Sequence, residues 1–307
     1  MFDVVMHADW SLSPKKRWFA RADRIGAGYL LGAPSLVGER PAFLADAATS
    51  GRTTLIGFDF PIGLPEAYGR AMGFSDFREA LHALGAGDWA QWFDVATDRT
   101  EISIRRPFYP MAPGGRKRAH LLDALGVTTT DELRRLCERA TMTRRAACPL
   151  FWTLGGNQVG KAAITGWREI VRPALRDHQA QLWPFDGGLR DLSHRSAIVI
   201  AETYPAESYR HVGARFKAGM SKRAQADRMT LAPSVETWAA RRGHELSPDL
   251  RDELSDGFGA GADGEDRFDA VLGLCGMVEV ISSRRAEGAP DTDAVRRWEG
   301  WILGQQG

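Results

Sequence analysis

Residues 53–65 read Thr-Thr-Leu-Ile-Gly-Phe-Asp-Phe-Pro-Ile-Gly-Leu-Pro. The apolar first half of this stretch indicates a buried β-strand. The strand ends at Asp59, and Pro61, Gly63 and Pro65 prevent it from continuing. The prediction of the fold starts from this pattern, an acidic residue directly after the carboxyl end of a buried strand.

Similar patterns along the chain predict an α/β protein. Apolar or alternating runs indicate strands at 3–8, 17–22, 27–33 and 196–201. Helical spacing of apolar residues indicates helices at 39–50, 205–212, 221–242, 264–285 and 291–303, of which 264–285 is expected to be amphipathic. We expect a mixed β-sheet flanked by helices.

The middle of the chain has a different texture. Helical fragments alternate there with Gly- and Pro-rich breaks, which indicates a large helical insertion. We therefore expect a discontinuous core formed by 1–65 and 196–285, an insertion at 66–195 and a C-terminal helical segment at 286–307.

Three of the expected strands end in an acid. Asp9 follows the first, Asp59 the fourth and Glu202 the fifth. Because ligands of α/β sheets bind beyond the carboxyl ends of parallel strands, these acids are expected at one edge of the sheet. Asp266 and Asp269 lie three residues apart and share one face of the following helix. Clustered carboxylates repel one another unless a cation neutralises them, and an all-oxygen set suits Mg²⁺ or Mn²⁺.

The order of these acids resembles the ribonuclease H-like superfamily, whose carboxylates hold two metal ions for phosphodiester cleavage. Shorter motifs resemble one family, the domain-of-unknown-function family 429, described as predicted nucleases of that fold. The motifs are His7-Ala-Asp-Trp-Ser11, Gly57-Phe-Asp-Phe-Pro-Ile-Gly-Leu-Pro65, Ala201-Glu-Thr-Tyr-Pro-Ala206 with Ser221-Lys-Arg223 and Arg228 beyond, and Asp266-Arg-Phe-Asp-Ala270. The last also resembles the final helix of RuvC-type resolvases.

The resemblance covers roughly 1–65 and 196–285, and it implies roles for the acids. If the chemistry is hydrolysis, Asp59 bridges two ions about 3.5–4 Å apart, with Asp9 on one and Glu202 or Asp269 on the other. Asp266 is a further ligand, or it only orients Asp269 and its helix. The chain departs from such families directly after Asp9, where it has Trp-Ser-Leu-Ser at 10–13 in place of the glycines they often carry.

Basic and aromatic residues near the acids are candidates for substrate binding. Lys222, Arg223 and Arg228 follow the third acid-bearing strand and could meet phosphates, or they form a charged helix face. Trp10 could stack on a base. His7, two residues before Asp9 on the same strand face, is a core histidine, a partner of the metal ligands or a proton shuttle.

The segment Gly155-Gly-Asn-Gln-Val-Gly-Lys-Ala162 nearly matches a phosphate-binding P-loop. Ala162 replaces the hydroxyl residue that should bind Mg²⁺. We therefore expect a glycine-rich loop that contacts a substrate phosphate through Lys161, or one that caps a helix.

Composition limits the remaining choices. The chain of 307 residues has a net charge of +1, 44% hydrophobic residues and no apolar run long enough to cross a membrane. Its start has no basic segment of the kind that opens a signal peptide. Three scattered cysteines without CxxC spacing indicate reduced thiols in the cytoplasm. We expect no membrane partner, and the sequence does not indicate an oligomeric state.

The leading prediction is a divalent-metal-dependent phosphodiester hydrolase, a nuclease, with Mg²⁺ or Mn²⁺ as cofactor and a nucleic acid or another phosphodiester as substrate. Two alternatives stay open. One is an ATP-dependent phosphotransferase of the related actin-like fold. The other is a catalytically silent binding module whose acids hold one structural cation or none.

Overall fold

The computed structural model describes residues 1–48, 51–110, 117–142, 144–153 and 159–306. Contacts divide the chain into two compact units. The first comprises Met1–Asp59, Ala174–Gly288 and Ile302–Gln306, and the second comprises Phe60–Pro173 and Ala289–Trp301. This division runs at different residues from the boundaries expected from the sequence, because 174–195 belong to the first unit and 289–301 to the second.

The first unit contains a mixed sheet of eight described strands. Their order is β6-β7-β5-β1-β2-β3-β8, with β4 paired to β2. β1, β5, β7 and β6 are parallel, whereas β1, β2 and β3 form an antiparallel meander. The strands are β1 (Val4–Asp9), β2 (Trp18–Ile25), β3 (Gly28–Leu31), β4 (Ser35–Leu36), β5 (Thr54–Phe58), β6 (Gln181–Leu182), β7 (Ile198–Glu202) and β8 (Glu245–Leu246). The expected α/β class with a mixed sheet is confirmed.

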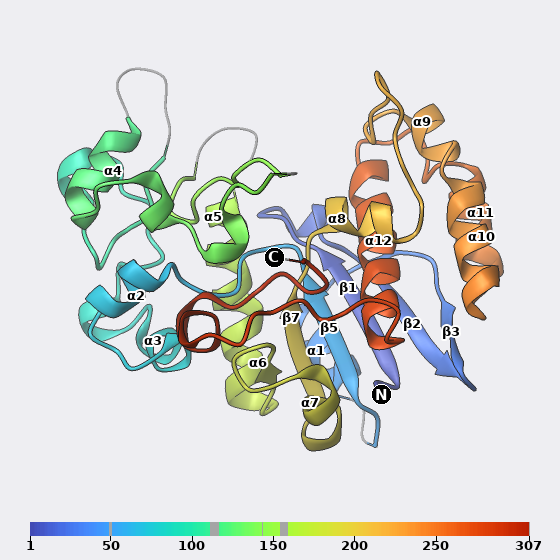
Figure 1. Cartoon of the computed structure of the whole chain (residues 1–307), viewed down its shortest axis with the longest axis horizontal. Coiled ribbons are helices and arrows are strands. Elements are labelled where there is room, and N and C mark those ends of the chain that lie inside the picture. Colours follow the sequence, from blue (N-terminus) through green and yellow to red (C-terminus); the bar gives the residue numbers. More distant parts are fainter. Residues whose placement is uncertain (49–50, 111–116, 143, 154–158, 307) are drawn as a thin grey trace. The chain divides into compact units, whose positions relative to one another are not determined.

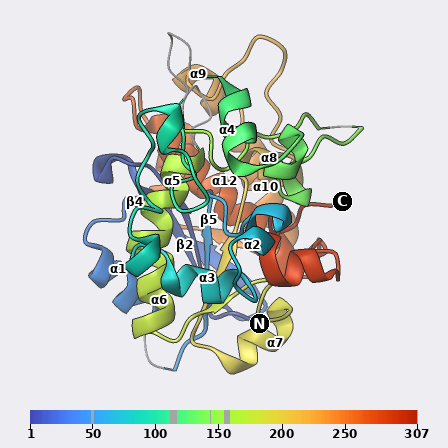
Figure 2. The same cartoon turned by 90° about the vertical axis from the view of Figure 1, so that its left-hand side faces the viewer.

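Helices cover both faces of this sheet (Figure 2). One face packs on α1, where the Phe43 ring contacts Phe58 of β5, and the other packs on α12, which lies across β1, β2 and β5. The helices of the unit are α1 (Arg40–Ala47), α7 (Leu189–Arg195), α8 (Pro205–His211), α9 (Gln225–Met229), α10 (Ala232–Arg242), α11 (Pro248–Ser255) and α12 (Gly264–Ile281). Another helix, α6 (Arg172–Asp177), starts in the second unit and ends in the first.

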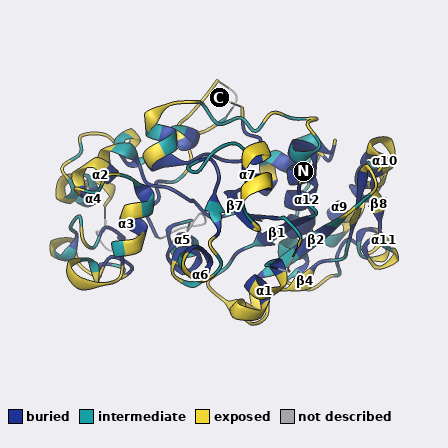
Figure 3. Ribbon diagram, turned by 90° about the horizontal axis from the view of Figure 1, so that it is seen from below, coloured by how far each residue is buried: buried dark blue, intermediate teal, exposed yellow. Residues whose placement is uncertain are grey.

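The expected amphipathic character of α12 is wrong. Every residue from Phe268 to Val280 is buried, because the helix packs against the sheet on one side and against α8 on the other (Figures 1 and 3). The expected helix at 221–242 is also interrupted. It consists of α9 and α10, and Pro233, which has no backbone N–H, lies in the first turn of α10.

Close contact between α12 and the sheet depends on glycines and on His7. A Cβ atom on Gly273 would lie 2.1 Å from the His7 ring, and one on Gly57 would lie 2.4 Å from the Met277 sulfur. His7 is fully buried, with Nδ1 3.0 Å from the Ala270 carbonyl and Nε2 2.9 Å from the Thr203 hydroxyl. Since a carbonyl only accepts, Nδ1 carries the proton and Nε2 accepts from Thr203. Burial lowers the pKa of His7 to about 4, so the ring is neutral and ties β1 and the end of β7 to α12.

The second unit is helical, with α2 (Glu66–Ala71), α3 (Phe77–Ala83), α4 (Arg118–Leu125), α5 (Val159–Gly166) and π-helical turns at Trp167–Val171 and Val295–Glu299. In place of the expected helix at 291–303 the chain forms only the last of these turns. The Pro61–Pro65 motif has a packing role here. The Leu64 N–H donates to the Trp298 carbonyl at 2.7 Å, and a Cβ on Gly63 would lie 2.2 Å from the Glu299 carbonyl oxygen.

Two further observations concern the whole described chain. None of its described helices combines the length and the apolar character needed to cross a membrane. The three cysteines are free thiols, of which Cys137 and Cys275 are buried.

The contact between Gly273 and His7 leads to a first prediction. Gly273→Ala should lower the free energy of unfolding by about 1–3 kcal/mol, because the added methyl overpacks a buried ring held by two hydrogen bonds. The measurement is urea denaturation. In a His7→Ala background the ring is gone, so the same substitution should cost less than in the wild type. Equal costs in both backgrounds would contradict the packing described here.

Candidate carboxylate site

The carboxyl ends of β1 and β5 bring Asp9 and Asp59 together. Ala8 pairs with Phe58 in adjacent parallel strands, so the next residue on each strand lies at the same edge of the sheet. The Trp10 N–H donates to Asp59 Oδ1 at 2.7 Å, and the Asp9 and Asp59 carboxyl groups interact with each other electrostatically. Burial is the main cause that raises the pKa of Asp59 to about 7. Burial and the Asp59 charge also raise the pKa of Asp9 well above its usual range. Burial therefore favours the protonated forms of this pair.

The third acid, Asp269, comes from α12 and is compensated by two donors. Lys222 Nζ lies 2.5 Å from Asp269 Oδ2, and the Tyr209 hydroxyl of α8 donates to Oδ1. Asp269 is 5% exposed, and its burial raises its pKa although Lys222 and Tyr209 oppose the shift. Lys222 Nζ also lies 2.9 Å from Oε1 of Glu265, one turn before Asp269. One ammonium group thus pairs with two acids of the same helix face.

Asp266 contributes a carboxylate oxygen without a partner. Its Oδ2 is buried, and no group in the described part of the chain hydrogen-bonds to it. Burial is the largest cause that raises the pKa of Asp266 to about 6. Asp266 and Asp269 also raise the pKa of Asp9 through their charges, which places all of these acids in one electrostatic cluster.

Glu202, by contrast, lies on the other face of the sheet. It pairs in register with Phe58 of β5, which itself pairs with Ala8, so its side chain leaves the sheet on the side away from His7 and Asp9. Glu202 is 4% exposed. The next residue, Thr203, lies on the α12 side and donates to His7. The strand end was located correctly from the sequence, but the structure does not bring Glu202 to Asp9 and Asp59.

The residues predicted to bind substrate have other contacts. Trp10 is 5% exposed, with the Arg17 guanidinium 4.1 Å above its ring and Phe58 packed against it. Arg228 is 2% exposed and donates to the carbonyls of Gly257, Gly259 and Lys222. Trp10 and Arg228 therefore support the fold around the site rather than an open binding surface.

Among the described contacts, neither Arg223 nor Lys161 pairs with one of the four aspartates of the cluster. Arg223 is exposed and 3.6 Å from Glu265, an ion-pair distance. Lys161 lies in α5 of the second unit, and the glycine-rich segment before it falls at 154–158, outside the described residues.

The oxygen donors of the cluster are of the kind that binds a divalent cation, but their side chains do not converge on one metal position in this structure. In the described residues, no three His, Cys, Asp or Glu side chains are arranged so that they could hold a metal ion as they stand. The donor set is nevertheless all oxygen, two of its carboxyl groups have raised pKa values, and Asp266 Oδ2 has no partner among the described groups. Hard divalent cations select such oxygen ligands, and metal binding displaces protons from them.

Sequence reasoning missed Tyr209, Glu265 and Thr203. Glu265 precedes Asp269 by four residues, so helical spacing alone could have added it to the acid face. Nothing in the local sequence links Tyr209 to Asp269, because their contact depends on how α8 packs on α12. Comparison of the chain with family models, curated proteins and solved structures finds no match. The family resemblance is therefore carried by the motifs alone.

The raised pKa values predict how stability depends on pH. A folded-state pKa above the unfolded value means that the stabilisation is complete below pH 4 and is lost as pH rises through about 7. In EDTA, Asp59→Asn should therefore stabilise the protein by about 1–3 kcal/mol at pH 8 and by much less at pH 5, because the amide removes the like charge. Thermal unfolding of Asp252→Asn, an exposed control on α11, should show no such trend. A gain for Asp59→Asn that does not change with pH would refute this account.

Loss of the Lys222 ammonium should have the opposite sign. Lys222→Met leaves Asp269 buried without its cation, and we expect a loss of about 1–2 kcal/mol at pH 8, since Lys222 is itself half-exposed. The loss should shrink as the pH is lowered, because the raised pKa of Asp269 makes it easier for this group to take up a proton. Arg223→Met provides the control, because Arg223 is 84% exposed. If both variants unfold at the same denaturant concentration, Lys222 does not compensate the buried acid.

Proposed function

We propose that the protein is a divalent-metal-dependent phosphodiester hydrolase, a nuclease, with a ribonuclease H-like core. The observation that carries the proposal is the juxtaposition of Asp9 and Asp59 at the carboxyl ends of two parallel strands, together with a buried Asp266 oxygen that has no hydrogen-bond partner among the described residues. Ligands of α/β sheets bind at this edge. The mixed sheet, with an antiparallel meander on one side of β1 and parallel strands on the other, supports the fold that the motifs suggest.

In this proposal Asp9 and Asp59 hold Mg²⁺ or Mn²⁺, and Asp266 provides a further oxygen. The bound ion would supply Lewis-acid activation of a phosphate oxygen or a water molecule. Asp269 has a different role from the one implied by the family resemblance, because both of its oxygens already accept hydrogen bonds from Lys222 and Tyr209. Lys222 provides a fixed positive charge next to the reacting phosphate, where the two-ion scheme would have a second metal.

Metal binding and cleavage test this proposal together. Mn²⁺ calorimetry should show saturable binding to the wild type that is lost in Asp59→Asn and kept in Asp252→Asn. Hydrolysis of labelled single-stranded DNA and RNA should require Mg²⁺ or Mn²⁺ and should fall at least a hundredfold in Asp59→Asn. Turnover that persists in EDTA, or Mn²⁺ binding that Asp59→Asn leaves unchanged, would refute the proposal.

Two observations favour a second candidate, the binding module without catalysis. Lys222 and Tyr209 already satisfy Asp269, and the described acids do not converge on a metal position. In this alternative, protonation of the Asp9–Asp59 pair and the ion pair of Lys222 with Asp269 compensate the charge permanently. The same calorimetry separates the two candidates, because a binding module of this kind takes up no Mn²⁺ at Asp59.

A further inference from the structure

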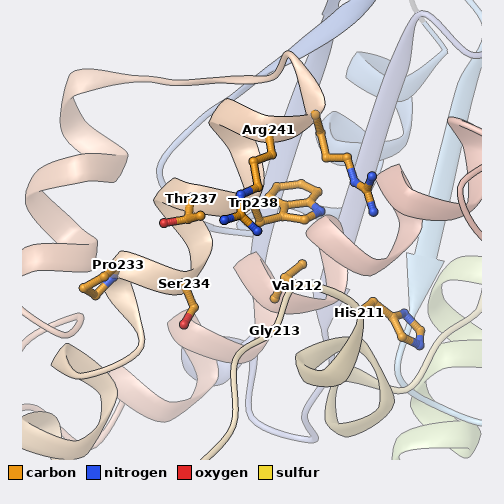
Figure 4. Close-up of a pocket in the computed structure, with 9 residues that line it drawn as sticks. His211, Val212, Gly213, Pro233, Ser234, Thr237, Trp238 and Arg241 are labelled. Atoms are coloured by element: carbon orange, nitrogen blue, oxygen red, sulfur yellow. The ribbon is translucent and has the colours of Figure 1, made fainter.

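The first unit carries a cavity of about 510 Å³ that is separate from the carboxylate cluster (Figure 4). One wall is formed by α10, through Ser234, Thr237, Trp238 and Arg241. The opposite wall is the end of α8 and the turn after it, His211–Gly213. The volume lies within the range of small-ligand sites and exceeds what a single phosphate group fills.

The wall formed by α10 presents unused hydrogen-bond donors. Ser234, Thr237 and Arg241 follow one another at three- and four-residue spacing, so they share one helix face. In the described residues no group hydrogen-bonds to the two hydroxyls or pairs with the Arg241 guanidinium. Trp238 lies on the same face but is buried, and its Nε1–H donates to Glu279 at 2.6 Å. This face of α10 is therefore polar and positively charged, and the buried Trp238 ring packs beneath it.

The charge around the cavity is positive. The described residues that line it include Arg241 and Arg242 but no acid. Arg242 is neutralised by Glu279, at 2.8 Å, whereas Arg241 has no acidic partner among the described residues. At the α8 end, burial and the charges of Arg285 and Arg210 lower the pKa of His211 to about 4. An anion would relieve this concentration of like charge.

We propose that this cavity binds a phosphate group of a polynucleotide strand, with Arg241, Thr237 and Ser234 as the donors. Arg and hydroxyl side chains are the usual partners of backbone phosphates. α8 connects the cavity to the carboxylate cluster, because Tyr209 reaches Asp269 and His211, two residues later, lines the cavity. The assignment of the phosphate to the strand being cleaved rests on the proposed function. A phosphorylated small molecule offers the same chemistry.

The test measures binding without cleavage. The probe is a fluorescein-labelled 12-nucleotide deoxythymidine strand, titrated by anisotropy in EDTA, with thymidine monophosphate titrated separately by calorimetry. Arg241→Glu and Thr237→Ala should both weaken binding, the charge reversal at least tenfold. For the strand, Arg241→Glu should also reduce the slope of log binding constant against log salt concentration by about the amount expected for one phosphate contact. Arg190→Glu, on the exposed side of α7, is the matched control and should leave binding within twofold of the wild type.

The outcomes separate the sources of the phosphate and the two proposals. If Arg241→Glu weakens binding of the labelled strand, the ligand is a polynucleotide. If it weakens only thymidine monophosphate, the cavity binds a free phosphorylated molecule. The inference is overturned if Arg241→Glu and Arg190→Glu bind both probes equally well. It is also overturned if neither probe binds the wild type. In the Asp59→Asn background, Arg241→Glu should weaken binding of the probes by the same factor. The cavity is therefore tested independently of the metal site, and a failure of one proposal can be distinguished from a failure of the other.

Discussion

Three buried or half-buried aspartates, Asp9, Asp59 and Asp269, lie together where the carboxyl ends of parallel strands meet α12. Like charges that are buried away from water repel one another strongly, so the charge of these carboxylates must be neutralised. The raised pKa values of Asp9 and Asp59 favour their neutral, protonated forms, and the ammonium of Lys222 pairs with Asp269. Much else in the first unit serves to place these groups, including the close packing of α12 at Gly57 and Gly273 and the Tyr209 contact from α8.

The neutral His7 shows how the core supports the site. Its ring joins Thr203, at the end of β7, to the Ala270 carbonyl of α12, directly next to Asp269. The helix is thereby held at a fixed height above β1, and Asp9 and Asp269 face the same region. Catalytic groups built on a rigid sheet and helix are positioned more accurately than groups on loops. His7 is thus a positioning residue of the core, and its hydrogen bonds leave no ring nitrogen for a metal.

Much of this arrangement could be predicted from the sequence, because hydrophobic periodicity and strand-ending acids are local signals. The strands β1, β5 and β7, the α/β class and the candidate pair Asp9 and Asp59 all follow from such patterns. Glu202 could not be excluded in this way, since a one-residue difference in register moves a side chain to the opposite face. The contacts of Tyr209 with Asp269, and of Arg228 with three carbonyls, arise between segments distant in the chain. The amphipathic prediction for α12 failed for the same reason, because α8 covers the side that would otherwise face solvent.

The central claim is that the Asp9–Asp59 pair is a cation site that holds a proton until a metal replaces it. The most direct test is a crystal soaked in MnCl₂ at pH 8, with diffraction data collected at the manganese absorption edge. We predict an anomalous peak within coordination distance of both carboxylates, while Lys222 stays on Asp269. An anomalous map without a peak at Asp9 and Asp59, from a crystal saturated with Mn²⁺, would contradict the claim.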